Sequence, residues 1–262
     1  MKLKNLVSII MTCHNGQRFL NEAVDSLIKQ THENWELIFY NNYSSDRSKN
    51  IILKYNDKRI RYFETDKILS LGDIRNRSIL KVKGDYICFL DVDDLWENNK
   101  IEKQLSLFQS LKNLDVVSSN YRILSGKKFV DNKFKVEKKY SQKEIIVSYI
   151  NGSPITSWLT LMIKKNSIKK LPYSFDKKLH ISSDFDLIIR LSNFANFYFI
   201  NSYLCTYRLH NKNESKNKKR ELSELMYIFG KFKNNRNILR HFNHKLFLIK
   251  VKIKYYLFKF LI

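Results

Sequence analysis

The chain has 262 residues, of which 44% are hydrophobic, and its formal net charge is +23. This much apolar material can bury a core, so a globally disordered chain is excluded, and the scarcity of Gly and Pro excludes collagen-like and linker-rich architectures. The positive charge favours anionic partners, namely nucleic acid, acidic lipid or phosphorylated substrates.

Short apolar runs alternate with helical patterns along the first half of the chain. Strands are predicted at 7–11, 36–40, 60–63, 86–90 and 115–123, with helices between them at 19–28, 45–55, 72–82 and 101–111. Further along, the patterns predict strands at 155–163 and 197–207, a helix at 183–193 and a polar, basic loop at 211–220. This order predicts an α/β fold with a mostly parallel sheet flanked by helices, in which ligands bind at the carboxyl ends of the strands.

The strongest local signal is the acidic segment Asp91-Val-Asp-Asp94, directly after the predicted strand 86–90. Carboxylates this close repel one another, which costs stability or raises a pKa. Mg²⁺ or Mn²⁺ relieves the repulsion, since both ions take oxygen ligands and favour one or two carboxylates plus substrate phosphates. The alternative is a solvated acidic loop that caps the next helix.

Three further polar segments each allow a functional and a structural interpretation. The segment 41–46 has side chains that can bond a base or sugar edge, but in isolation an Asx-turn with a helix cap is favoured. In Ser182-Ser-Asp-Phe-Asp186 one carboxylate can serve as a general base, or the acids can simply cap a helix. Arg208 and His210 lie two apart in an extended segment and suit phosphate binding, although a lone His is usually structural.

Taken in order, these segments resemble the family 2 glycosyltransferases of the GT-A fold over about residues 5–215. The resemblance rests on the opening strand and turn 7–15, Gln30-Thr31, Trp35-Glu-Leu-Ile38, the segment 41–46, Arg75-Asn76, Gly84-Asp-Tyr-Ile87, Asp91-Val-Asp-Asp94, Asp184, and Tyr207-Arg-Leu-His210 with Ser215. Asn41 and Asn42 replace two acids of the family pattern, and Ser183 stands where many members have Glu. The Gln-x-x-Arg-Trp motif of processive members is absent, which favours single-sugar transfer.

The resemblance implies a nucleoside diphosphate sugar as donor, with a UDP-sugar favoured. The residues expected to bind the donor are Thr12, His14, Asn15, Asn41, Arg75, Asp91, Arg208 and His210. Asp93, with Asp91 and His210, is expected to hold Mn²⁺ or Mg²⁺. Asp184 is expected to deprotonate a hydroxyl of a glycan or lipid-linked acceptor, so that one displacement through an oxocarbenium-like transition state inverts the sugar. The resemblance fits a role in cell-surface polysaccharide, lipopolysaccharide or glycan biosynthesis.

The same resemblance divides the chain into a GT-A catalytic domain, 1–215, and a basic, aromatic C-terminal extension, 216–262. Within the domain, 1–115 is the expected nucleotide-sugar half and 116–215 the acceptor half. The extension is interpreted as a docking element for anionic lipid, or as a helix packed on the domain or on the second subunit of a homodimer. Truncation after Arg220 is accordingly expected to preserve donor binding and to weaken vesicle association.

Cellular location is inferred from cysteines and from hydropathy. The three cysteines are far apart and form no CxxC pair, which argues against a disulfide framework or zinc site and favours a reducing cytosol. Since no stretch reaches about 18 uncharged apolar residues, we expect a cytoplasmic protein, or one peripheral on the cytoplasmic face of a membrane.

Three other functions compete with the glycosyltransferase interpretation. A catalytically inactive sugar-nucleotide-binding relative is suggested by Asn41 and Asn42. A nucleic-acid-binding protein is suggested by net charge, but no motif supports it and an acidic cluster without metal would repel phosphate, so no nucleic-acid partner is expected. A nucleotidyltransferase would show a Gly-rich basic loop near the first strand, which 12–18 matches poorly.

Overall fold

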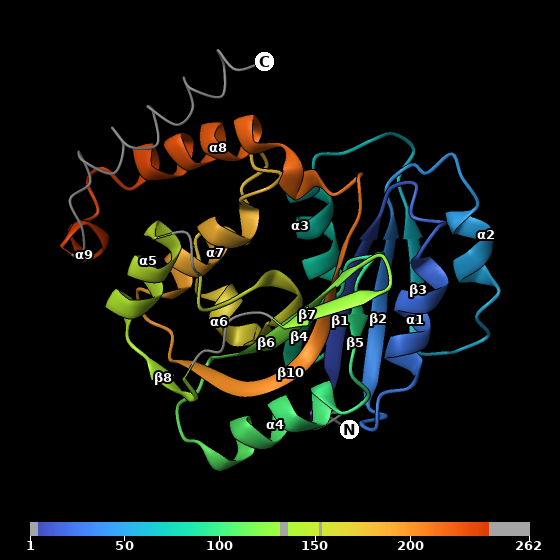
Figure 1. Cartoon of the computed structure of the whole chain (residues 1–262), viewed down its shortest axis with the longest axis horizontal. Helices are drawn as coiled ribbons and strands as arrows, with labels where there is room; N and C mark the ends of the chain where they lie inside the picture. Colours follow the sequence, from blue (N-terminus) through green and yellow to red (C-terminus); the bar gives the residue numbers. More distant parts are fainter. Residues whose placement is uncertain (1–4, 132–135, 152–153, 241–262) are drawn as a thin grey trace.

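The computed structural model describes residues 5–131, 136–151 and 154–240. These residues build a ten-stranded sheet with helices on both faces (Figure 1). Along its main path the strand order is β3-β2-β1-β4-β9-β6-β10-β5, with β7 beside β6 and β8 beside β10. The predicted α/β class is therefore confirmed.

The first half of the chain forms the parallel part of the sheet. Its strands are β1 (Val7–Cys13), β2 (Trp35–Asn41), β3 (Ile60–Glu64) and β4 (Tyr86–Phe89). The helices between and after them are α1 (Leu20–Ile28), α2 (Ser48–Leu53), α3 (Leu71–Lys81) and α4 (Lys100–Ser110). Cys13 lies opposite Asn41 in the register of β1 and β2, so the polar segments that follow both strands leave the sheet side by side.

The second half of the sheet is mixed rather than parallel. Its strands are β5 (Leu95–Trp96), β6 (Val116–Ser125), β7 (Lys128–Asp131), β8 (Lys138–Tyr140), β9 (Met162–Lys164) and β10 (Phe197–Leu209). Strand β9 is antiparallel to both β4 and β6, whereas β10 is parallel to β6. The expectation of a mostly parallel sheet thus holds for the path β3-β2-β1-β4. Strand β10 matters for function because its end brings Arg208 beside the loop that follows β4.

The predicted strand 155–163 is wrong over most of its length. A 3-10 turn, η1 (Trp158–Thr160), and the short β9 occupy its second half. The turn closes because Thr160 donates both its N–H and its hydroxyl to the carbonyl of Ser157. Trp158 is buried by stacking on Phe89, with ring centroids 3.8 Å apart, so aromatic packing rather than strand pairing buries this apolar run.

Both faces of the sheet are covered by core side chains. On one face β1 packs through Ile9 against α1 and α4, and on the other Ile10 contributes to the core shared with α3 and with α7 (Ser183–Leu191). Burial on both faces explains why the strands are almost continuously apolar instead of alternating. The remaining helices are α5 (Gln142–Ile150), α6 (Lys165–Lys169), α8 (Lys218–Lys231), α9 (Arg236–Leu239) and the 3-10 turn η2 (Glu214–Lys216).

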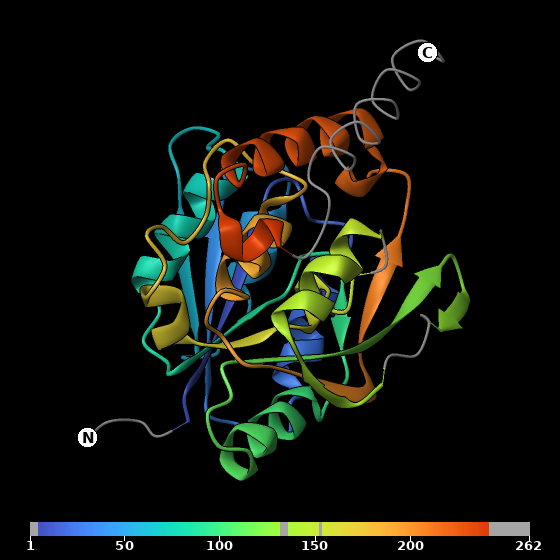
Figure 2. The ribbon, with the colours of Figure 1, turned by 90° about the vertical axis from the view of Figure 1, so that its left-hand side faces the viewer.

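A third core joins the C-terminal helices to the rest of the molecule. Ile228, Phe229 and Phe232 pack with Phe185 and Ile189 of α7. Figures 1 and 2 show α8 lying across α7, at the edge of the molecule towards which β1 and β2 point. Of the interpretations of the extension, a helix packed on the domain therefore describes α8. The segment 241–262, to which the lipid-docking hypothesis chiefly applies, lies outside the described residues.

The three cysteines are buried, unpaired, and spread over separate strands: Cys13 in β1, Cys88 in β4 and Cys205 in β10. They are packed as small core side chains. Among residues 5–131, 136–151 and 154–240, none of the helices has the length and apolarity needed to cross a bilayer.

Candidate active site

The polar segments after β1 and β2 hold each other in place. His14 Nδ1 lies 2.9 Å from the carbonyl oxygen of Asn42. The Asn15 N–H donates to Ser44 Oγ at 2.9 Å, and Asn15 Oδ1 accepts the Ser45 N–H at 2.9 Å. His14 and Asn15 are exposed, so both are accessible to a ligand at this edge of the sheet.

The side-chain amide of Asn41 is engaged at both ends within the protein. Its Oδ1 accepts the Ser44 N–H at 3.1 Å, and its Nδ2 donates to the Tyr62 hydroxyl at 3.1 Å. The Asn41 side chain is buried, while Asp46 makes the Asx-type bond of this segment by accepting the Ser48 N–H at 2.9 Å. Thr12 lies one residue earlier in the register, half-buried in β1 opposite Tyr40.

The three acids after β4 occupy different environments. Asp94 is 1% exposed and accepts the Arg208 N–H at 2.9 Å. Burial raises its pKa well above the ordinary value, and the charges of Asp91 and Asp93 raise it further. Burial likewise raises the pKa of Asp91 to about 6, while Arg75 opposes the shift and Asp93 and Asp184 add to it. The mutual repulsion expected within the segment is thus present.

Strand β10 returns to this acidic segment and contacts it through Arg208 and His210. His210 Nε2 lies 2.8 Å from Asp93 Oδ2, and Arg208 Nε donates to the Asp93 carbonyl at 2.9 Å. The Arg208 guanidinium also pairs with Glu22 at 2.7 Å. The Phe19 ring lies 5.1 Å from the His210 ring and 4.5 Å from the Arg208 guanidinium. Sequence reasoning brought Arg208 and His210 together but missed Phe19 and Glu22, which matched an ordinary helical pattern.

Arg75 lies between the acidic segment and α7. Only 7% of it is exposed, its guanidinium lies 4.0 Å from the Trp158 ring, and it donates to the Ser183 hydroxyl. Burial lowers the pKa of Arg75, and the charges of Asp91 and Asp184 oppose that shift. Arg75 therefore lies between the carboxylates of Asp91 and Asp184, and its expected role in donor binding stays a prediction. Trp158 was missed because its segment was taken for a strand.

Asp184 lies in the first turn of α7 and faces this cluster. Its Oδ1 accepts the Phe185 N–H at 2.8 Å. Burial raises the pKa of Asp184, and the Phe185 N–H and the Arg75 charge only partly offset the effect. Glu221 of α8 raises that pKa further, so burial and neighbouring charge, and not the helix terminus alone, govern the carboxyl.

Asp186, two residues on, is committed to an internal ion pair. It is 0% exposed and lies 2.8 Å from Arg190 and 2.6 Å from Lys231. Its charge is neutralised by two cations from α7 and α8. Of the two acids in this turn, only Asp184 is therefore oriented towards Arg75 and Asp91.

The candidate site offers few metal ligands of its own. Nowhere in the described parts of the chain do three or more His, Cys, Asp and Glu side chains come together in a way that could hold a metal ion. Asp93 and His210 form a pair at 2.8 Å, but Asp91 does not complete a three-residue set with them. A cation here would consequently need oxygen donors from the substrate as well, which is how Mg²⁺ commonly binds beside phosphates.

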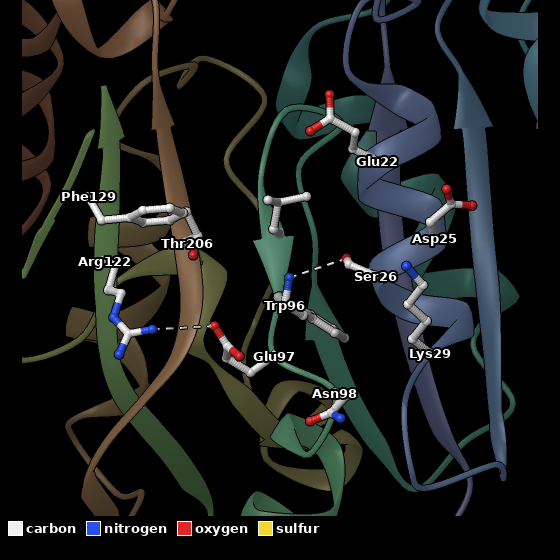
Figure 3. Close-up of a pocket in the computed structure, with 11 residues that line it drawn as sticks. Glu22, Asp25, Ser26, Lys29, Trp96, Glu97, Asn98, Arg122, Phe129 and Thr206 are labelled. Atoms are coloured by element: carbon white, nitrogen blue, oxygen red, sulfur yellow. Dashed lines mark hydrogen bonds and ion pairs between the residues drawn. The ribbon is translucent and has the colours of Figure 1, made fainter. Parts of the chain in front are cut away.

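A groove of about 680 Å³ lies elsewhere, between α1 and strands β5, β6, β7 and β10 (Figure 3). Its lining residues are Glu22, Asp25, Ser26, Lys29, Leu95, Trp96, Glu97, Asn98, Arg122, Phe129 and Thr206. No predicted site residue lines it. Its link to the cluster above is Glu22, which pairs with Arg208.

Comparison with known proteins identifies the family. The family model described as Glycosyl transferase family 2 matches residues 8–171. The chain belongs to glycosyl transferase family 2. It is 29% identical over 232 residues to the Escherichia coli UDP-Glc:alpha-D-GlcNAc-diphosphoundecaprenol beta-1,3-glucosyltransferase, covering 88% of this chain and 87% of that relative. It is therefore a glycosyltransferase, which favours this interpretation over nucleic-acid binding.

Solved structures confirm the GT-A fold of this glycosyltransferase. S. aureus TarS 1–349 in complex with UDP-GlcNAc superposes with a TM-score of 0.76 at 16% identity, covering 94% of this chain and 71% of TarS. The mannosyltransferase PcManGT from Pyrobaculum calidifontis, in complex with GDP-Man and Mn²⁺, gives a TM-score of 0.68 at 12% identity and covers 94% and 73%. At these identities the likeness concerns the fold alone.

Proposed function

We propose that this glycosyltransferase moves a single sugar from a UDP-sugar to a hydroxyl of a lipid-linked glycan, with inversion and with Mn²⁺ or Mg²⁺ bound. The observation that carries the proposal is the cluster at the carboxyl end of the sheet, in which Arg75 joins Asp184 to Asp91, and the acidic segment in turn meets His210. The candidate base, Asp184, thus faces the candidate donor site across the buried guanidinium of Arg75. The names of the E. coli relative and of the TarS complex support UDP-sugar chemistry.

Asp184 is the base in this proposal. Its carboxylate takes the proton of the acceptor hydroxyl, the freed oxygen attacks the anomeric carbon, and the bond to the diphosphate oxygen breaks. A single displacement of this kind inverts the anomeric configuration, as water attack does in inverting glycosidases. Asp186 cannot take this part, because Arg190 and Lys231 hold its carboxylate inside the protein.

Asp93 and His210 are the residues that would hold the cation together with diphosphate oxygens. When bound there, a divalent cation stabilises the charge that develops on the leaving diphosphate. Arg208 supports this arrangement from the protein side, since its backbone N–H and its guanidinium fix Asp94 and the carbonyl of Asp93.

A lipid-linked acceptor also suits the charge of the chain. At +23 the protein is attracted to anionic surfaces, so we propose that it works peripherally at the cytoplasmic face of a membrane, in the synthesis of a cell-surface glycan. A homodimer through residues 216–262 stays a hypothesis.

Donor choice and metal dependence are tested first by thermal unfolding. UDP-, GDP- and dTDP-sugars are screened with and without Mn²⁺, because a ligand that binds the native state raises its melting temperature. We expect a UDP-sugar to give the largest shift and EDTA to remove most of it. Turnover is then measured as UDP released from UDP-glucose with an N-acetylglucosamine diphospholipid as acceptor, and the product anomer is assigned by NMR. Retention of configuration would refute the single displacement, and donor binding without any turnover would identify an inactive relative.

Asp184→Asn tests the base directly. The Asn side chain keeps an oxygen that can accept the Phe185 N–H, so folding should be preserved. Because the amide cannot accept the proton, kcat should fall roughly 10²–10⁴-fold while donor affinity stays near that of the wild type. Glu33→Gln, an exposed acid at the opposite edge of the sheet, is the matched control. A fully active Asp184→Asn variant would remove Asp184 from the mechanism.

A further inference from the structure

Helix α8 reaches the segment that carries Asp184 through a buried carboxylate. Glu224 is 7% exposed, and its two oxygens accept different backbone N–H groups. Oε1 accepts the His180 N–H at 3.0 Å, and Oε2 accepts the Ser182 N–H at 2.8 Å. Ser182 is the N-cap residue of α7, two positions before Asp184.

These bonds supply a cap that α7 cannot make for itself. In a capping box, a Glu or Gln at the third helical position bonds the N-cap backbone N–H. Here that position is Phe185, which has no acceptor in its side chain, and the Ser182 side chain makes no capping bond either. Glu224 performs the task from a helix about 40 residues further along the chain.

Lys231 of the same helix holds the other side of Asp184. Its Nζ lies 2.6 Å from Asp186 and 2.7 Å from Asp176. Helix α8 therefore fixes the chain at residues 180 and 182 before Asp184 and at residue 186 after it. Ordinary packing of Ile228 and Phe229 on α7 would not require either polar contact.

We propose that α8 is a positioning element for the base, acting through Glu224, which orients the first turn of α7 and with it the Asp184 carboxylate. The inference rests on the proposed role of Asp184. A shift of about 1 Å in a reacting group can cost of order 10²-fold in rate, so a loosened first turn should lower turnover without touching the donor site.

The test is a graded pair of substitutions in the full chain. Glu224→Gln keeps one acceptor oxygen and should lose one of the two bonds, whereas Glu224→Ala loses both. With UDP-glucose, Mn²⁺ and the diphospholipid acceptor, we expect kcat to fall about 10- to 100-fold for Glu224→Ala and less for Glu224→Gln. The KM for UDP-glucose should change less than about twofold in both variants, since Glu224 bonds the backbone of His180 and Ser182, whereas Asp93 pairs with His210. Ser223→Ala, exposed on the same helix, should match the wild type.

Amide hydrogen exchange gives a second readout that needs no substrate. Exchange at residues 180–186 should accelerate in Glu224→Ala and, to a smaller degree, in Glu224→Gln, at temperatures where both remain folded. If Glu224→Ala fails to fold, Glu224→Gln and its exchange rates carry the test. The inference is overturned if Asp184→Asn is inactive while the folded Glu224 variants keep wild-type kcat, or if exchange at 183–186 is unchanged. An active Asp184→Asn variant would instead defeat the proposed base.

Discussion

At the scale of single residues, Asp93 and His210 are the pair on which cation binding depends. Asp93→Ala removes the carboxylate that contacts His210 within the described part of the chain, so the Mn²⁺-dependent part of the donor-induced thermal shift should disappear. The metal-independent part should remain, because the segments after β1 and β2 are untouched. Glu33→Ala, at the far edge of the sheet, should behave as the wild type. An undiminished Mn²⁺ effect in Asp93→Ala would place the cation elsewhere.

Glu36 makes stability depend on pH. Burial alone would raise its pKa, but hydrogen bonds from the Ser8 hydroxyl, the Lys83 backbone and Arg61 outweigh it and lower the pKa below 4.5. Because the folded-state pKa is depressed, this stabilisation is complete above about pH 4.5 and is lost as the pH falls through the folded value.

Glu36→Gln should therefore reduce the free energy of unfolding by about 1–3 kcal/mol at pH 7. The difference from the wild type should shrink at pH 3.5, because the unfolded chain binds a proton at Glu36 below about pH 4.5 while the native carboxylate, with its lowered pKa, resists protonation. Urea melts at the two pH values provide the measurement. Equal differences at both would show that shape, and not charge, explains the contacts of Glu36.

Single residues also show how far sequence reasoning reaches. The pattern located Asp184 and Asp186 in one helical turn but left open which of them faces the ligand. The distinction depends on Lys231, 45 positions after Asp186, which pairs with Asp186 and leaves Asp184 to Arg75. An ion pair between residues so far apart in the chain cannot be detected from the periodicity of the sequence.

At the scale of elements, the strands before residue 90 were predicted well because their apolar runs are short and bounded. Strands β1, β2 and β4 are largely buried, whereas the edge strand β3 is only half-buried. The run 155–163 has the same composition, and it failed because Thr160 and Ser157 close a turn that periodicity does not detect. Helix α8 was hidden for a different reason. Its buried apolar residues are Leu222, Ile228 and Phe229. The lysines around them make the segment read as polar and basic, so its helical periodicity was not recognised in the sequence.

The ion pairs between α7 and α8 should contribute strongly to stability. Asp186→Asn leaves Arg190 and Lys231 facing each other without their shared anion. Removing one partner of a buried pair costs about 3–5 kcal/mol, and we expect a loss in this range by chemical denaturation. The exposed pair of Lys49 and Glu64 supplies the comparison, because Glu64→Gln should cost less than about 1 kcal/mol. Similar losses for both variants would contradict the buried pair's importance.

At the scale of the whole molecule, the C-terminal helices complete the core. A chain ending at residue 217 loses Ile228, Phe229 and Phe232, each buried against α7. Each such side chain contributes roughly 1.5–3 kcal/mol, a large share of the 5–15 kcal/mol typical of a domain. This packing argues against the expectation that truncation after Arg220 preserves donor binding.

We expect the chain ending at residue 217 to lose its cooperative thermal transition, measured by circular dichroism. A chain ending at Arg240 keeps every described residue of this core and serves as the comparison. If the shorter chain melted cooperatively at the wild-type temperature and bound donor, the conclusion that α8 completes the core would be wrong.

The buried thiols of β1, β4 and β10 can report how often these strands open. Burial raises the pKa of all three, that of Cys205 to about 12, so neither exposure nor thiolate favours reaction with a disulfide reagent in the native state. Labelling must wait until the strand that holds each sulfur opens, and its rate then reports how often that strand is released. Cys13 lies next to His14, so a bound donor should delay its labelling in proportion to occupancy. The affinity for the donor can then be determined from the labelling rate of Cys13 at different donor concentrations, without an acceptor, a dye or an engineered probe.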